Sequence, residues 1–290
     1  MAAVLVAAAA LRPAAVLAHD PAASAIDEVT LWLARGLFAG AWLAYAVGAC
    51  MRRPTRARRA CAHTALAVGA LALFGPLDAW AVRSTAMHMV QHMLLIVVVA
   101  PLLVLAAPLA QWRAAIGSGF DPLWRTSIRA TRHPIACASV HAAVLWVWHA
   151  PAPYMAAVLH TGWHLVEHAC FLGSAWLFWW AVLKAGRRER PRALLALLLT
   201  LMHTGLLGAL LTFAREPLYW RESRELWDQQ LAGLAMWVPG STAYLLAAVL
   251  LSLRWLDARP GPHAGSSPAP RAVGARGAPA ARPTRARDVR

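Results

Sequence analysis

The chain has 290 residues, of which 60% are hydrophobic and only 14% are charged. Ordinary soluble domains carry about 25% charged residues, so this composition excludes a typical soluble protein and favours a membrane protein. The formal net charge of +15 does not indicate a nucleic-acid partner, because the basic residues form short clusters between apolar segments. Such a distribution is typical of the loops that set membrane topology.

The first eighteen residues have the general character of a signal peptide. An apolar stretch ends in small residues near Ala18, although a basic start is missing and Arg12 interrupts the apolar core. We predict a possible signal peptide over residues 1–18 and leave its cleavage open. Cleavage after Ala18 would make His19 the first residue of the mature protein.

Seven apolar segments follow, and most are long enough to cross about 30 Å of hydrocarbon as a helix. They are predicted at residues 31–50, 61–80, 87–111, 135–149, 163–184, 193–213 and 231–253. A backbone in lipid must satisfy its own hydrogen bonds, and no alternating-strand pattern occurs here. The expected fold class is therefore all-α, a polytopic bundle of about seven transmembrane helices over residues 30–255.

Basic residues predict the orientation of this bundle. With the N-terminus outside, the inner connectors and the C-terminal segment hold 22 lysines and arginines, whereas the outer connectors hold four. Cytoplasmic loops are the ones enriched in these residues, so we expect the C-terminus to be cytoplasmic. Residues 259–290, which are rich in Pro, Gly, Ala and Arg, are predicted to form a disordered basic cytoplasmic tail.

This topology gathers most of the twelve histidines on the outer side of the bundle. Residues four apart share one face of a helix, so His88 and His92 form a stripe with Gln91 beside it. His164 and His168 form a second stripe, which His160 joins if the helix begins there. Ionisable groups in membrane helices usually face a functional interior, and paired imidazoles suit metal ions. The pattern predicts a metal or haem site.

Polar residues at the start of the seventh segment fall on the same side. Asp228 could cap a helix N-terminus or orient a ligating imidazole, and the cap is favoured. Gln229 and Gln230 follow it, and Met236 lies further along the same segment.

Two other residue types near the histidines have open interpretations. Glu167 lies between His164 and His168 and could fix an imidazole tautomer or cap the loop. Met87, Met89 and Met93 point away from the stripe of His88 and His92 under helix geometry. Packing is the favoured role for each methionine, although thioether sulfur does suit Cu(I).

One short motif suggests a different chemistry. The stretch HLVEH matches H-x-x-E-H, an inverted zinc-protease motif. A protease would also need a third zinc ligand, such as Glu222 or Glu225, and an accessible zinc-bound water. Nothing in the sequence places such a ligand, so the motif is a weak signal for an enzyme.

Five longer motifs carry a family resemblance. In this order the chain contains MHMVQHMLL, WVWHAP, HTGWHLVEHACFL, LMHTGLLGALLTF and DQQLAGLAMWVPG. Together they resemble the CtaG-type cytochrome c oxidase assembly factor family of bacteria, over roughly residues 30–255. The unrelated single-span copper chaperone of the same name uses exposed cysteines on a soluble domain, and this chain has neither feature.

The resemblance implies a non-enzymatic factor of the bacterial inner membrane that matures a haem–copper oxidase by binding copper and delivering it at the periplasmic side. Its partners would be cytochrome c oxidase subunits and membrane lipid. The residues that it implies as metal ligands are His88, His92, His149, His164, His168 and His203. Those that it implies as supporting residues are Gln91, Asp228, Gln229, Gln230 and Met236, to which the local pattern adds Glu167.

The sequence leaves rival functions open. Copper would bind transiently among the third to seventh helices and pass to a partner's histidines. Alternatively, His92 and His168 could ligate one haem from facing helices, in a haem handler or an electron carrier. A transporter is a third class, since His141 and His203 extend toward mid-membrane, but the inner half lacks residues to complete a path. A structural scaffold for oxidase subunits is the fourth.

Overall fold

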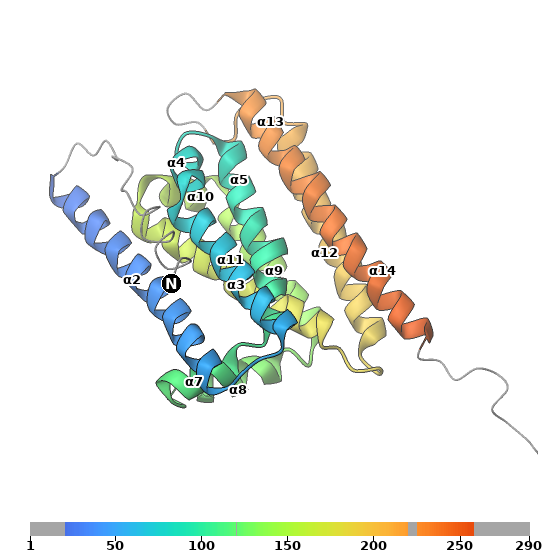
Figure 1. The fold of residues 1–290 in the computed structure, drawn as a ribbon. Coiled ribbons are helices and arrows are strands. Elements are labelled where there is room, and N and C mark those ends of the chain that lie inside the picture. Colours follow the sequence, from blue (N-terminus) through green and yellow to red (C-terminus); the bar gives the residue numbers. More distant parts are fainter. Residues whose placement is uncertain (1–20, 120, 220–224, 258–290) are drawn as a thin grey trace, which may run out of the picture. The chain divides into compact units, whose positions relative to one another are not determined.

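The computed structural model describes residues 21–257, except residue 120 and residues 220–224. The predicted signal peptide and the predicted tail lie outside the described residues. Every regular element in the described part is a helix, which confirms the all-α fold class. In chain order (Figure 1) these are α2 (Pro21–Met51), α3 (Arg56–Phe74), α4 (Pro76–Ala81), α5 (Thr85–Met93), the π-helix η1 (Leu94–Val99), α6 (Ala100–Ala106), α7 (Leu109–Ile116), α8 (Asp121–Ala130), α9 (Pro134–Trp148), α10 (Pro151–Leu159), α11 (Thr161–Leu183), α12 (Arg190–Thr212), α13 (Leu226–Ala235), the π-helix η2 (Met236–Gly240) and α14 (Ser241–Asp257).

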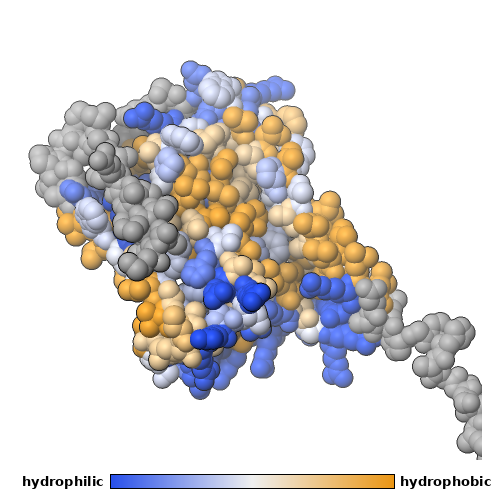
Figure 2. Space-filling view, in the orientation of Figure 1, coloured by the Kyte–Doolittle hydropathy of each residue, from blue (hydrophilic) through white to orange (hydrophobic). Residues whose placement is uncertain are grey.

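Six stretches are long and apolar enough to span a membrane. They are Ile26–Met51, Arg56–Ala81, Thr85–Ala106, Thr161–Leu183, Arg190–Thr212 and Leu226–Leu256. The bent pair α9 and α10 supplies a seventh if the two count as one span, in agreement with the predicted number. Figure 2 shows hydrophobic side chains over much of the flank of the bundle, with hydrophilic side chains gathered toward its ends.

The bend between α9 and α10 explains why the fourth predicted segment is short. The two helices meet at 71°, and Pro151 begins α10. Proline disfavours helical backbone in the residue before it, and Ala150 accordingly has an extended conformation with ψ of 144°. His149 is thus the last residue before the bend, at the C-cap of α9.

Close backbone contacts hold the last helices together. Gly208 of α12 and Gly233 of α13 approach so closely that a Cβ atom added to Gly233 would lie 2.5 Å from the carbonyl oxygen of Gly208. Such contacts, which only glycine permits, are common where membrane helices pack. Figure 1 shows α12 beside the continuous run of α13 and α14 along one flank.

A π-helix interrupts the third span directly after its histidines. Within the stretch Thr85–Ala106, α5 gives way to η1 at Leu94. Single π-turns inside α-helices are frequent at functional sites. A second π-helix, η2, lies in the seventh span and contains Pro239.

Candidate metal site

Two helices bring four potential metal ligands together inside the bundle. His88 and His92 come from α5, and His164 and Glu167 come from α11. One ligand atom from each lies within 4.8 Å of the others. His88, His92 and Glu167 are buried, and His164 is partly buried. We call these four residues the His/Glu group.

The carboxylate of Glu167 in α11 lies against both histidines of α5. Its Oε2 lies 3.3 Å from Nε2 of His88 and 3.4 Å from Nε2 of His92. These contacts lack hydrogen-bond geometry, and both carboxylate oxygens and both ring nitrogens of His92 have no hydrogen-bond partner in the described part of the chain. Buried polar atoms are normally satisfied, so this arrangement fits a bound cation that accepts their lone pairs.

Two further histidines, His168 and His149, lie beside the His/Glu group. The ring centroid of His168 lies 5.3 Å from that of His92 and 4.2 Å from that of His164. The ring of His149 lies 6.3 Å from that of His92. The predicted helical stripes therefore face each other, and His149 joins them from a third helix. His160 is exposed at the N-cap of α11 and lies outside the His/Glu group.

Asp228 positions the helix that carries His88 and His92. It lies within α13, yet its carboxylate accepts hydrogen bonds from the backbone N–H of Thr85 at 2.5 Å and of Ala86 at 3.3 Å, and from Oγ of Ser84 at 2.6 Å. A carboxylate at a helix N-terminus satisfies free N–H groups and complements the helix dipole. Asp228 thus caps the start of α5 rather than the start of its own helix.

Two stacked tyrosines lie against the site. The ring of Tyr154 from α10 lies 5.3 Å from that of His88 and stacks on Tyr219 at 3.9 Å. The hydroxyl of Tyr219 donates to the backbone carbonyl of His149 at 2.9 Å. Burial raises the pKa of the Tyr219 phenol, so it stays a hydrogen-bond donor at physiological pH.

The remaining predicted residues have other partners. Gln91 donates from Nε2 to the carbonyl of Ala72 at 2.8 Å and to Asp78 at 3.1 Å, which joins α5 to α3 and α4. His203 of α12 lies outside the His/Glu group, and neither of its ring nitrogens has a hydrogen-bond partner in the described part of the chain.

The other residues of the seventh span shape its surroundings. Gln229 accepts from the backbone N–H of Leu218, and Gln230 donates to the carbonyl of Ala214. Both contacts hold the connector that brings Tyr219 over the site. Met236 packs in the same apolar cluster as Tyr154 and Tyr219.

The protease interpretation of HLVEH finds limited support in this geometry. Glu167, the residue that would activate a zinc-bound water, faces the two α5 histidines. Of the proposed third ligands, Glu222 lies outside the described residues, and the side chain of Glu225 accepts from Nε1 of Trp227 at the surface. Two residues of the motif, His164 and Glu167, thus belong to the group of potential ligands that α11 shares with α5.

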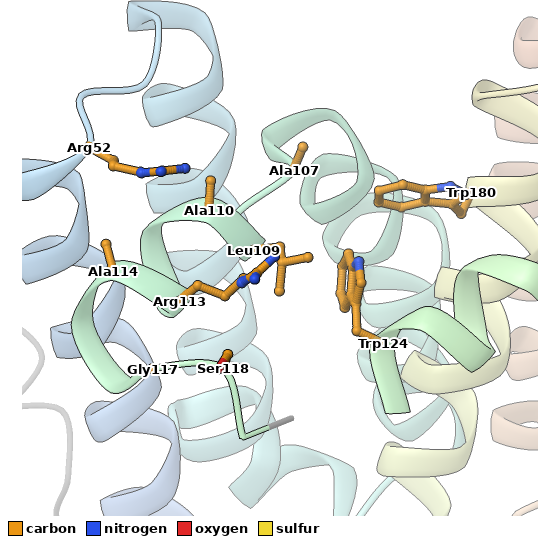
Figure 3. Close-up of a pocket in the computed structure, with 10 residues that line it drawn as sticks. All are labelled: Arg52, Ala107, Leu109, Ala110, Arg113, Ala114, Gly117, Ser118, Trp124 and Trp180. Carbon is orange, nitrogen blue, oxygen red and sulfur yellow. The ribbon is translucent and has the colours of Figure 1, made fainter. Parts of the chain in front are cut away.

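Two cavities show how the site relates to the surface. One of about 470 Å³ lies among α2, α3 and α11, has mostly apolar walls and includes His168. Another of about 640 Å³ lies among α7, α8 and neighbouring segments (Figure 3), and none of its lining residues is a histidine or a carboxylate. Figure 3 shows Trp124 and Trp180 on one side of it and Arg52 on the other. The second cavity therefore has no part in the group of potential metal ligands, and the first adjoins that group through His168.

Sequence reasoning missed two features of this site. It did not identify Ser84 and Asp228 as a joint cap of α5, because their separation of 144 residues leaves no local signal. It also gave Met89 a packing role, and Met89 is indeed buried in an apolar cluster. Its Sδ nevertheless lies 3.3 Å from Nε2 of His149, a contact between helices that periodicity within one helix cannot predict.

Comparison with known proteins adds a family assignment to this geometry. The family model of the cytochrome c oxidase caa3 assembly factor (Caa3_CtaG) matches residues 38–258. A search of curated proteins and a search of solved structures found no match. The matched region includes every residue of the His/Glu group, its two neighbouring histidines and the Asp228 cap. The chain belongs to the cytochrome c oxidase caa3 assembly factor family.

Proposed function

We propose that this protein binds copper at the outer side of the bacterial inner membrane and delivers it to a haem–copper cytochrome c oxidase during assembly. One observation carries the proposal. Ligand atoms of three histidines and one glutamate converge within 4.8 Å in the interior of the bundle, in a chain whose family assembles this oxidase.

The donor set suits a cargo metal. Imidazole is a good ligand for copper, and one carboxylate offsets part of the charge of the ion. His168 and His149 lie beside the His/Glu group, so a copper ion has alternative nitrogen ligands within reach. A delivery site must release its metal, and exchange among neighbouring imidazoles provides a path toward a partner's histidines.

A haem site is less compatible with the packing. A haem ligated by His92 and His168 needs its porphyrin between the two rings. Here their centroids lie 5.3 Å apart, and the ring of Phe171 packs against His92 at 4.5 Å. The helices would have to separate to admit the porphyrin, whereas a single ion needs no such rearrangement.

The proposal can be tested in cells that depend on this protein for oxidase maturation. We expect His88→Ala and His168→Ala to lower the amount of mature, copper-containing oxidase at least about tenfold, because each removes an imidazole from the site. The protein itself should still accumulate in the membrane. His133→Ala is the matched control, since His133 is exposed at the N-cap of α9.

The results for these variants distinguish delivery of copper from a scaffold role. Restoration of maturation by added copper in the histidine variants would support delivery of copper. Normal oxidase in both variants would exclude these residues from the mechanism and leave a scaffold that binds oxidase subunits.

A further inference from the structure

The contact between Met89 and His149 is unusual for a buried pair. Nε2 of His149 lies 3.3 Å from Sδ of Met89. Nδ1 of the same ring lies 2.7 Å from the carbonyl oxygen of Leu145. A carbonyl can only accept, so we assign the ring hydrogen to Nδ1. In the neutral ring Nε2 then carries a lone pair, and the thioether has no hydrogen to donate. Two acceptors face each other.

Both sides of this contact are held in place. Met89 is fully buried in an apolar cluster that includes Ala86, Tyr154 and Met236. His149 is held through its ring by the Leu145 carbonyl and through its own carbonyl by Tyr219. The contact is therefore built into the fold at the bend after α9.

The geometry matches two ligands of one ion. Metal–nitrogen and metal–sulfur bonds are about 2.0 and 2.3 Å long, so donors 3.3 Å apart would subtend roughly 100° at a shared ion. A thioether selects soft ions such as Cu(I) over Zn²⁺. An imidazole whose other nitrogen donates to a carbonyl is oriented as metal-bound histidines usually are.

We propose that Sδ of Met89 and Nε2 of His149 form a Cu(I) station beside the His/Glu group. This inference rests on the proposed function and adds the oxidation state of the cargo and a second position for it. The ring of His92 belongs to the His/Glu group and lies 6.3 Å from that of His149. Cu(I) moves between the two positions by ligand exchange, without a change in its oxidation state.

X-ray absorption at the copper edge of the full chain, purified and loaded with one equivalent of Cu(I), tests this inference. The wild-type protein should show both sulfur and nitrogen scatterers. Met89→Leu should lose the sulfur scatterer and weaken Cu(I) binding at least about tenfold, while Zn²⁺ binding changes less than twofold. Met93 carries a second thioether in the same helix, and its Sδ lies close to Gly240. Met93→Leu should therefore retain the sulfur scatterer. In selenomethionine-labelled protein the sulfur scatterer should become selenium, a readout that does not depend on the folding of any variant.

Other results of this experiment would overturn either the Met89 station alone or the proposed function as well. Copper bound through nitrogen and oxygen alone in the wild-type protein would overturn the Met89 station and leave the proposed function standing. A sulfur scatterer that persists in Met89→Leu would also overturn it. Failure of the wild-type protein to bind Cu(I) at all would overturn the proposed function with it.

Discussion

Glu167 is a buried carboxylate that faces two imidazoles without a hydrogen bond to either. Burying a charge is costly unless it is paired, so its presence in the bundle requires a compensating interaction. Under the proposed function, a cation held between Glu167, His88 and His92 would supply that interaction. Glu167 would then matter for binding of the metal more than for stability of the fold.

Replacement of Glu167 by glutamine separates these two roles. Glu167→Gln keeps the shape of the side chain and removes its charge, so the metal-free protein should be as stable as the wild type or more stable. Copper affinity should fall about 10- to 100-fold. Thermal unfolding of the metal-free protein in detergent and a Cu(I) competition titration measure the two effects. A large loss of stability in the metal-free variant would show that Glu167 is mainly structural.

Asp228 acts at the residue scale through the helix that it caps. Asp228→Ala should destabilise the protein by about 1–3 kcal/mol, because it leaves the N–H groups of Thr85 and Ala86 without their acceptor. It should also weaken copper binding, since His88 lies one helical turn from Ser84. Gln230→Ala, which removes a single hydrogen bond to a connector carbonyl, is the control and should have a smaller effect on both thermal unfolding and copper titration.

The sequence could predict part of the site at this scale. Spacing of four residues identified the stripes of His88 with His92 and of His164 with His168, because that relation lies within one helix. The role of Glu167 stayed open, since only the facing of α5 and α11 brings its carboxylate to both α5 histidines. Gln91 was expected near the metal because it lies beside the stripe, yet its amide donates to α3 and α4.

Helix packing determines how accurately these side chains are placed. The close approach of Gly208 and Gly233 fixes α12 against α13, the helix that carries Asp228. A methyl group on either glycine would separate these helices and displace the cap of α5. The glycine contact thus connects the packing of the last helices to the histidines.

A single methyl group tests this connection. Gly233→Ala should destabilise the protein by about 1–3 kcal/mol, because its Cβ would lie 2.6 Å from the backbone nitrogen of Thr212. Gly173→Ala in α11 is the matched control, since an added Cβ there meets no atom within 4 Å. Its unfolding temperature should be unchanged or slightly raised. Equal unfolding temperatures for the two variants would contradict the proposed role of the glycine contact.

Most elements could be predicted from hydropathy, and the bend could not. Segments at 61–80, 163–184 and 193–213 match helical spans because length and apolar composition suffice in lipid. The fourth segment looked merely short, since the sequence does not show that α10 continues after Pro151 at an angle of 71°. His149 ends α9 at this bend, and its Nε2 lies 3.3 Å from Sδ of Met89.

At the scale of the whole molecule, the orientation in the membrane decides from which side copper enters. The count of basic residues predicts that α5 and α11 begin on the outer side, which would put the His/Glu group near the periplasm. This orientation is a prediction from charge, because the arrangement of helices is the same whichever side is outside.

Reporter fusions test the orientation. Alkaline phosphatase, which is active only outside the cytoplasm, should be active when fused after Ala214 and inactive when fused after Gly186. A fluorescent protein that folds in the cytoplasm should show the opposite pattern. The reverse result would place the His/Glu group toward the cytoplasm and would exclude capture of periplasmic copper.

The most direct test of the central claim is the metal content of the full chain purified from membranes, recorded together with its optical spectrum. We predict one equivalent of copper after incubation with Cu(I), no Soret band, and loss of that copper in a variant that combines His88→Ala, His92→Ala and His149→Ala. A Soret band with stoichiometric haem iron, or copper binding that survives the loss of all three histidines, would contradict the account.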